Sequence, residues 1–342
     1  MEKKRALVIA PGRGTYNKEE FGYLHRYHSD KTGLLVEFDA LRQDAGQPTL
    51  TELDATGRYS LSRHGRGDNA SALIHACALA DFHTIDRDRF DVVAITGNSM
   101  GWYVALACGG ALNARDGFRL VNTMGTLMHE AMIGGQMLYP VVDDDWREIP
   151  GKRAEIMALI DATDGLYLSI DLGGMLVLAG KPDALAEAEG HLPPTGGRFP
   201  MRLSNHAAFH SPLQAPVAAR GQAALPVEMF DQPQLPLIDG RGQIWFPLMS
   251  DPGDLRDYTL GHQVIAPYNF SRAVRNGMFE FAPDVVIILG PGRTLGGAVA
   301  QSLIGCSWQG LDSKAGFQAR NLEVPIILSM GMDEQRKSVV GG

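Results

Sequence analysis

Residues 91–101 read DVVAITGNSMG, an apolar run that leads into the pentapeptide GNSMG at 97–101. The apolar run predicts a buried strand, and the stretch 102–108 after it predicts a helix. A serine on a sharp strand-to-helix turn projects its hydroxyl from the sheet edge, and a glycine on each side lets the backbone turn. The helix N-terminus behind it favours a developing negative charge. Ser99 is therefore a candidate nucleophile; the alternative is an idle serine in a glycine-rich turn.

Strand and helix patterns alternate on both sides of this turn. Asp68 and Asn69 are expected to cap the helix that ends at 82, and Asp116 the helix that ends at 132. Strands that alternate with helices indicate a parallel sheet covered on both faces. The expected strands are 5–10, 91–96, 285–290 and 324–330, and the expected helices are 33–43, 50–61, 70–82, 102–112, 117–132 and 295–304, with a frayed polar tail over 333–342.

The middle of the chain has a different pattern. The elements expected there are strand 136–142, helix 151–163, strands 166–172 and 174–180, helix 182–192 and strand 198–204. This β-α-β-β-α-β order is that of a ferredoxin-like module. We therefore expect an α/β protein with a parallel-sheet, hydrolase-like large domain formed by 1–132 and 206–342, and an inserted small domain formed by 133–205.

Composition narrows the functional class. The chain has 342 residues and a formal net charge of −8, which argues against a general nucleic-acid binder. No apolar run reaches the roughly 20 residues of a membrane span, and no dinucleotide-binding fingerprint is present. Three cysteines, Cys77, Cys108 and Cys306, lie far apart and are expected to be buried free thiols. We expect a cytoplasmic monomer with no cofactor and no nucleic-acid or membrane partner.

A serine nucleophile needs a base, because its hydroxyl is weakly nucleophilic at neutral pH. Two histidines, His206 and His210, lie after the last strand of the expected insertion. Their spacing also fits metal ligands on one helical turn. No glutamate stands between them, no third ligand is near, and Pro212 interrupts a helix, so we expect no metal.

Four motifs resemble those of the malonyl-CoA:acyl-carrier-protein acyltransferases, in the same order along the chain. The segment AFHSPL at 208–213 resembles the active-site histidine motif of that family, and GNSMG at 97–101 resembles its Gly-His-Ser-Leu-Gly turn. PGRG at 11–14 resembles its Pro-Gly-Gln-Gly loop, and GPGR at 290–293 its Gly-Pro-Gly-Lys loop. An insertion between the serine and the histidine is also a feature of the family.

The resemblance implies a role for several residues. Ser99 would form an acyl ester, and His210 would act as general base. In this family a backbone carbonyl orients the histidine, and the matching residue is Gln263. The backbone N–H groups of Arg13 and Met100 match the oxyanion hole.

Further residues are implied to line the substrate site, and some depart from the family pattern. His206 is expected to pack or to form a hydrogen bond at the rim of the cleft, and Asn98 replaces the usual histidine. Trp102 replaces a glutamate; its bulk would narrow the site or, as we favour, pack beside the serine turn. Met124 stands where malonate-carrying members have an arginine that binds the free carboxylate. Because a methionine cannot pair a carboxylate, this favours an acyl group without one, acetyl or a longer aliphatic chain. The alternative is that another cation takes over, namely Arg13, Arg115 or Arg119.

The resemblance implies acyl-CoA as one substrate and acyl carrier protein as partner, in fatty acid or polyketide synthesis. Three other interpretations stay open. The first is an acyl hydrolase of the same fold, in which water deacylates Ser99. The second is an unrelated α/β-hydrolase esterase, which would place its histidine closer to the C-terminus than His210. The third is a non-catalytic module that docks a carrier protein.

Overall fold

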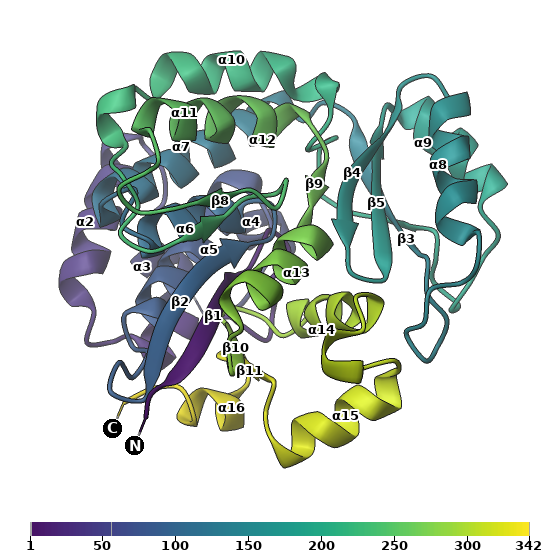
Figure 1. Ribbon diagram of the computed structural model, residues 1–342. Coiled ribbons are helices and arrows are strands. Elements are labelled where there is room, and N and C mark those ends of the chain that lie inside the picture. Colours follow the sequence, from purple (N-terminus) through teal and green to yellow (C-terminus); the bar gives the residue numbers. More distant parts are fainter. Residues whose placement is uncertain (1, 56, 342) are drawn as a thin grey trace.

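Two β-sheets organise the chain, as the computed structural model in Figure 1 shows. The structure describes residues 2–55 and 57–341. Within that part the larger sheet has six strands in the order β11-β10-β1-β2-β7-β8. Neighbouring strands are parallel except β7 and β8, which are antiparallel. The strands are β1 (Lys4–Ala10), β2 (Phe90–Gly97), β7 (Leu237–Ile238), β8 (Ile244–Trp245), β10 (Val285–Ile288) and β11 (Ile327–Ser329).

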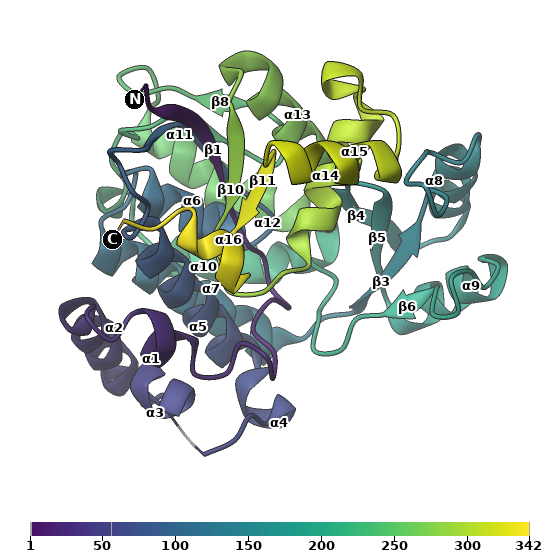
Figure 2. The same cartoon turned by 90° about the horizontal axis from the view of Figure 1, so that it is seen from below.

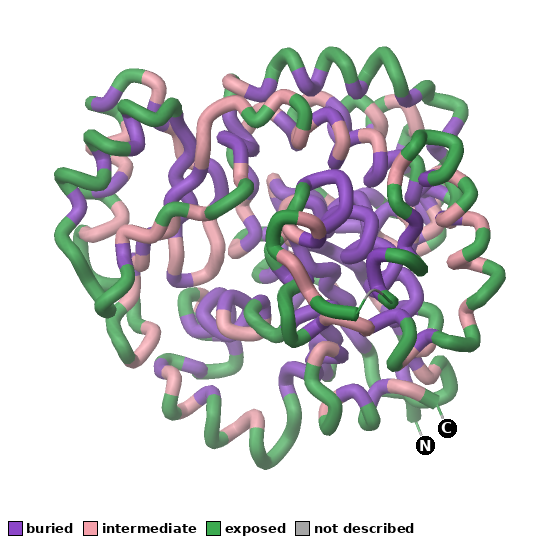
Figure 3. Tube along the Cα trace, turned by 180° about the vertical axis from the view of Figure 1, so that it is seen from behind, coloured by how far each residue is buried: buried purple, intermediate pink, exposed green. Residues whose placement is uncertain are grey.

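Helices cover both faces of the larger sheet. Figure 2 shows α13 (Phe270–Phe281) and α14 (Leu295–Gly305) on one side of the central strands, and α5 (Gly67–Phe82), α6 (Gly101–Cys108) and α7 (Ala114–Ala131) on the other. Every residue of β10 and of α5 is buried, and the buried chain gathers in the middle of the molecule (Figure 3). Continuous apolar runs are typical of parallel strands covered on both faces. The predicted α/β fold is confirmed.

Further helices surround this body. They are α1 (Tyr23–Tyr27), α2 (Thr32–Asp44), α3 (Leu50–Ala55), α4 (Leu61–His64), α10 (Ala215–Ala224), α11 (Pro252–Asp257), α12 (Gln263–Ile265), α15 (Lys314–Glu323) and α16 (Asp333–Lys337). The predicted helix 33–43 corresponds to α2. The predicted helix 50–61 is wrong as one element, because α3 ends at Ala55 and α4 begins at Leu61; residue 56 between them lies outside the described residues.

The second sheet is mostly antiparallel and has the strand order β6-β3-β5-β4-β9 within the described residues. Its chain order, β3 (Gly135–Pro140), α8 (Lys152–Ala162), β4 (Leu166–Leu172), β5 (Met175–Gly180), α9 (Pro182–His191) and β6 (Met201–Arg202), is the predicted β-α-β-β-α-β. The edge strand β9 (Tyr268–Asn269) comes from outside the expected insertion and pairs in parallel with β4. The domain boundaries at 132/133 and 205/206 stay predictions.

Three details of the sequence prediction are wrong at element ends. Asp68 and Asn69 lie inside the first turn of α5 rather than capping it, because that helix begins at Gly67. The N-cap of α7 is Asn113, whose side chain accepts from the backbone N–H of Asp116. Cys306 is half-buried, whereas Cys77 and Cys108 are buried as predicted.

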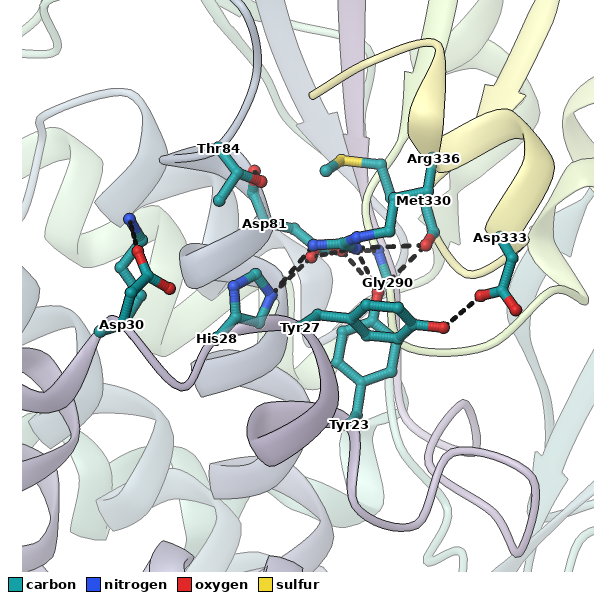
Figure 4. A network of polar contacts seen from close by, with 11 residues as sticks. Tyr23, Tyr27, His28, Asp30, Asp81, Thr84, Gly290, Met330, Asp333 and Arg336 are labelled. Atoms are coloured by element: carbon teal, nitrogen blue, oxygen red, sulfur yellow. Dashed lines mark hydrogen bonds and ion pairs between the residues drawn. The ribbon is translucent and has the colours of Figure 1, made fainter. Parts of the chain in front are cut away.

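The predicted frayed tail is also wrong over 333–337, where the chain forms α16. Arg336 reaches from this helix to buried Asp81 of α5, with 2.6 Å between Nη1 and Oδ1 (Figure 4). The same carboxylate accepts from His28 Nε2 at 2.8 Å, from the Tyr23 hydroxyl at 2.8 Å and from the Gly290 backbone N–H at 2.7 Å. One buried charge therefore ties the C-terminal helix to the N-terminal helices.

The GPGR motif at 290–293 belongs to this network rather than to the turn at Ser99. A Cβ on Gly290 would lie 2.0 Å from the Tyr23 hydroxyl oxygen, and one on Gly292 would lie 2.6 Å from the carbonyl oxygen of Thr15. The Thr15 hydroxyl in turn donates to the Gly12 carbonyl at 2.9 Å. The glycines thus allow the C-terminal loop to support the loop that carries Arg13.

Candidate active site

Ser99 stands in the three-residue turn between β2 and α6. Its φ is 56°, a left-handed conformation that costs a non-glycine residue about 1–2 kcal/mol. A Cβ on Gly97 would lie 2.2 Å from the carbonyl oxygen of Gly101, and one on Gly101 would lie 2.3 Å from that of Ala10. No other residue type fits at either position, so the two glycines of GNSMG permit this turn.

The Ser99 hydroxyl meets the His210 ring. The distance from Oγ to Nε2 is 2.7 Å, and His210 Nδ1 lies 2.6 Å from the backbone carbonyl oxygen of Gln263. Because that carbonyl can only accept, Nδ1 carries the ring proton and Nε2 accepts from the Ser99 hydroxyl. The arrangement is that of a serine beside a general base that is held by a third group.

Gln263 is itself fixed by its side chain, which sequence reasoning missed. Its Oε1 accepts from the Tyr103 hydroxyl at 2.9 Å, and its Nε2 donates to the Ser99 carbonyl at 3.2 Å. A π-helical turn at Tyr258–His262 precedes it. The segment that orients the histidine is therefore joined directly to the serine turn, an interaction between distant parts of the chain that no local pattern reveals.

Burial keeps the His210 ring neutral. Removal from water lowers the pKa of His210 to about 4, and the hydrogen bond to the Gln263 carbonyl opposes this shift only in part. Desolvation disfavours the charged imidazolium. At neutral pH the ring is thus available to take a proton from Ser99.

A narrow cavity opens beside Ser99 and His210. Its volume is about 30 Å³, room for one or two water molecules. The walls are mainly apolar, and Arg13 is the one charged side chain among the described residues that form them. The lining residues are Arg13, Ser71, Ser99, Met100, Tyr103, Val121, Gly125, Met128, Phe209, His210, Gln263 and Val264.

The two backbone groups expected to form an oxyanion hole are free to bind a ligand. Arg13 follows β1 and Met100 precedes α6, and both line the cavity. Over 2–55 and 57–341, neither backbone N–H has a hydrogen-bond acceptor. The first turn of a helix leaves such donors unpaired, and they suit a developing oxyanion.

Two residues expected in the substrate site are buried in the core instead. Met124 is fully buried and does not line the cavity; its sulfur lies 2.6 Å from where a Cβ on Gly221 would be. The cavity face of α7 is formed by Val121, Gly125 and Met128, each one helical turn after the one before. Trp102 is also fully buried, and its indole N–H donates to the Thr259 hydroxyl at 3.0 Å.

Asn98 and His206 also lie outside the cavity lining. Asn98 points toward the loop after β1, where its Nδ2 is 3.1 Å from the position of a Cβ on Gly12. His206 Nδ1 is 2.9 Å from Gln136 Oε1. Gln136 donates to Ser169, whose hydroxyl donates to the carbonyl of Phe209 at 2.8 Å. This chain of hydrogen bonds supports the backbone next to His210. Contacts of Asn98 and His206 with substrate stay predictions.

The described residues contain neither a metal-binding cluster nor a membrane-spanning helix. Over residues 2–55 and 57–341, no group of three or more histidine, cysteine, aspartate or glutamate side chains is placed to hold a metal ion. Over the same residues, the helices are too short or too polar to cross a lipid bilayer.

Comparison with known proteins relates the chain to one family, although no family model matches it. A malonyl CoA-acyl carrier protein transacylase of Haemophilus influenzae is 27% identical over 210 residues, which cover 59% of this chain and 63% of the relative. The malonyl-CoA:acyl carrier protein transacylase of Xanthomonas oryzae pv. oryzae superposes with a TM-score of 0.77 at 18% identity, over 100% of both chains. The chain is thus similar in sequence to malonyl-CoA:acyl-carrier-protein acyltransferases over 59% of its length and shares their fold.

The structural likeness to this acyltransferase family extends over nearly the whole chain. A malonyl-transacylase solved with a type II polyketide synthase acyl carrier protein has a TM-score of 0.73 at 18% identity and covers 98% of this chain and 99% of its own. At that identity the likeness shows the fold. The sequence match to the Haemophilus influenzae relative spans about 63% of that protein's length.

Proposed function

We propose that the protein transfers a short acyl group from coenzyme A to the thiol of an acyl carrier protein, through an ester on Ser99. The observation that carries the proposal is the 2.7 Å contact between Ser99 Oγ and His210 Nε2. The carbonyl of Gln263 supports it, since it leaves Nε2 free to accept a proton. The relationship to malonyl-CoA:acyl-carrier-protein transacylases supplies the substrate and partner classes.

In the first half-reaction His210 Nε2 takes the hydroxyl proton while Ser99 Oγ attacks the thioester carbonyl carbon. The carbonyl oxygen becomes an oxyanion, which the N–H groups of Arg13 and Met100 stabilise. The C–S bond then breaks, and His210 returns the proton to the departing coenzyme A sulfur. The acyl group stays on Ser99 as an ester.

In the second half-reaction the carrier thiol enters where coenzyme A left. His210 takes the thiol proton, and the sulfur attacks the ester carbonyl of Ser99. The C–O bond breaks, and the proton passes from His210 to the serine oxygen. The carrier leaves as a thioester, and the free enzyme is restored.

The size of the cavity favours a short acyl chain. About 30 Å³ is free beside Ser99, and a long aliphatic chain would have to displace several buried side chains. Met124, which would favour an acyl group without a carboxylate, packs against α10 and does not line the cavity. Arg13 lines the cavity, so a cation is present beside Ser99.

Intact-mass measurement after mixing with a panel of acyl-CoA thioesters tests the proposal. We expect one acyl adduct on the protein and none on Ser99→Ala. Adding acyl carrier protein should discharge the adduct at least tenfold faster than water does. Faster discharge by water would favour the acyl hydrolase. If no thioester gave an adduct, the non-catalytic docking module would be favoured.

A further inference from the structure

One buried tyrosine contacts both the His210 ring and the turn that carries Ser99. The hydroxyl of Tyr268 donates to the carbonyl of Gly97, the first residue of GNSMG, at 2.5 Å. The Tyr268 ring lies beside the His210 ring, with 5.3 Å between the ring centroids and 52° between the ring planes. Because Ser99 and His210 are 111 positions apart, a side chain that contacts the surroundings of both bears on how they meet.

The hydroxyl of Tyr268 fixes the peptide unit that leads into Ser99. The carbonyl of this unit, from Gly97, accepts from Tyr268, and its N–H, from Asn98, donates to the Ala10 carbonyl at 3.1 Å. A buried peptide unit that is bound at both groups cannot rotate without losing a hydrogen bond. Burial raises the pKa of the Tyr268 hydroxyl well above its usual range, so the group stays protonated and remains a donor.

The ring of Tyr268 limits the movement that is left to the His210 imidazole. The hydrogen bond to the Gln263 carbonyl fixes one atom of that imidazole, Nδ1. The ring could still tilt about this bond, because the preferred donor directions at a carbonyl oxygen are broad. A tilt would move Nε2 away from Ser99 Oγ. The neighbouring aromatic ring of Tyr268 restricts it by direct packing.

Tyr268 can hold other groups because it is itself held at three points. Its backbone, in β9, pairs with Ile170 of β4 (Figure 1). Its ring packs on Gly240, where a Cβ would lie 2.4 Å from ring atom Cδ2, and the N–H of the next residue, Asn269, donates to the Gly240 carbonyl at 2.6 Å. The hydroxyl bond to Gly97 is the third point. The residue is fully buried, so its ring has no free space to turn into.

We propose that Tyr268 is a positioning residue that sets the reactive distance between Ser99 Oγ and His210 Nε2. Tyr268 does not line the cavity beside Ser99, so it acts through these two residues and not by touching the substrate. The proposal rests on the acyl transfer proposed above, in which the pair forms and breaks the ester on Ser99.

The test measures the loading of Ser99 by rapid quench and intact mass, over a range of concentrations of malonyl-CoA or acetyl-CoA, whichever loads the wild type faster. Tyr268→Phe keeps the ring and loses the hydroxyl, and Tyr268→Leu loses both. The maximal loading rate should fall by about 3- to 10-fold in Tyr268→Phe and by about 30- to 100-fold in Tyr268→Leu, since misplacing reacting groups by about 1 Å can cost about 100-fold. The half-saturating concentration should stay within about twofold of the wild type, because no substrate contact is lost.

Tyr139→Phe is the matched control. Tyr139 is also a fully buried tyrosine whose hydroxyl donates to a backbone carbonyl, that of Pro193 at 2.8 Å, but it lies in the core of the smaller sheet. Tyr139→Phe and Tyr268→Phe each leave a carbonyl without its donor, so both should lower the melting temperature by a few degrees. The loading rate of Tyr139→Phe should stay within about twofold of the wild type, because the site is distant.

A fluorophosphonate distinguishes failure of this role from failure of the proposed acyl transfer. The reagent modifies an activated serine: Ser99 Oγ bonds to phosphorus, fluoride leaves, and His210 takes the hydroxyl proton. Its reaction rate should follow the same order, with the wild type fastest and Tyr268→Leu slowest. If neither thioester loaded Ser99 while this order held, the acyl transfer would be wrong and the role of Tyr268 would stand.

Several outcomes would overturn the role of Tyr268. Wild-type rates in Tyr268→Leu would show that Ser99 and His210 meet without the ring. An equal fall in Tyr139→Phe and Tyr268→Phe would assign the effect to stability alone, and this comparison decides the question if Tyr268→Leu does not fold. A raised half-saturating concentration at an unchanged maximal rate would mean that Tyr268 shapes the substrate site. A wild type that reacts with neither thioester nor fluorophosphonate would remove the pair that Tyr268 is said to position.

Discussion

Ser99 and His210, whose side chains are 2.7 Å apart, both have a left-handed backbone, with φ of 56° and 54°. Each stands at a point where the chain turns sharply, Ser99 between β2 and α6, and His210 just before the short 3₁₀ turn at Pro212–Gln214. Residues held in sparsely populated conformations cost about 1–3 kcal/mol each and gather at functional sites. The fold therefore holds the two side chains together at the cost of local backbone strain at both residues.

The strain at Ser99 predicts an unusual order of stability for two variants. Ser99→Gly should be more stable than Ser99→Ala by about 1 kcal/mol, because glycine adopts positive φ without a Cβ clash. Urea denaturation gives the two free energies of unfolding. The matched control is Ala219→Gly on the exposed side of α10, where glycine should instead lose about 1 kcal/mol. A less stable Ser99→Gly would contradict the assigned backbone.

The lowered pKa of His210 predicts that Ser99 is loaded well below neutral pH. The ring must be neutral to act as base, and its pKa in the free protein is about 4. The rate of acyl-ester formation should thus change less than twofold between pH 7 and pH 5.5. A histidine with an ordinary pKa of about 6.5 would be about 90% protonated at pH 5.5. A tenfold fall over that range would contradict the burial argument.

Buried His75 predicts a loss of stability in acid. Its ring packs against Phe38 and Phe118, both ring nitrogens lack a partner in the described chain, and burial lowers its pKa to about 3. Below pH 6.5 the unfolded state binds a proton that the folded state does not. The free energy of unfolding therefore falls as the pH falls, by about 1.4 kcal/mol per pH unit for this residue.

His75→Leu should remove that contribution. Urea titrations at pH 6.5 and 5.0 should show a smaller pH dependence than the wild type, by about 2 kcal/mol over the interval. His25→Gln, at an exposed histidine of α1, is the control and should follow the wild type. An unchanged pH dependence in His75→Leu would mean that the ring is solvated.

Removal of the Asp81 carboxylate should strongly destabilise the protein, although Asp81 is not part of the Ser99 site. Asp81→Ala would leave the Arg336 guanidinium buried without its anion (Figure 4), and breaking such a pair typically costs about 3–5 kcal/mol. Asp81→Ala/Arg336→Met should recover part of the loss. Asp333→Ala, an exposed carboxylate bonded to Tyr27, should cost less than about 1 kcal/mol. Equal losses in Asp81→Ala and Asp333→Ala would contradict this ranking.

The serine turn was predictable from sequence because its requirements are local. Two glycines, an apolar run before them and a helix after them specify the backbone at Ser99 without reference to other segments. The pairing with His210 and the carbonyl of Gln263 came only through the family resemblance, because the contacts join residues 111 and 53 positions apart.

The other site residues depended on tertiary contacts that sequence alone did not give. The family resemblance matched Met124 to the carboxylate-binding position, but the sequence does not show which face of α7 carries its side chain. In the structure the side chain faces the core. Trp102 was expected either to narrow the site or to pack, and His206 to pack or hydrogen-bond at the rim of the cleft; their partners, Thr259 and Gln136, lie on segments that no local pattern relates to them. The Tyr103 hydroxyl was missed, since a tyrosine in an apolar helix gives no signal of its partner.

The strand β9 connects the smaller sheet to the turn that carries Ser99. Tyr268 pairs with β4 of the smaller sheet, while its hydroxyl donates to the Gly97 carbonyl at 2.5 Å and its ring lies 5.3 Å from that of His210. Only four residues separate it from Gln263. A displacement of the smaller sheet would therefore reach the imidazole by two short routes, the ring contact with Tyr268 and the hydrogen bond from His210 Nδ1 to the Gln263 carbonyl.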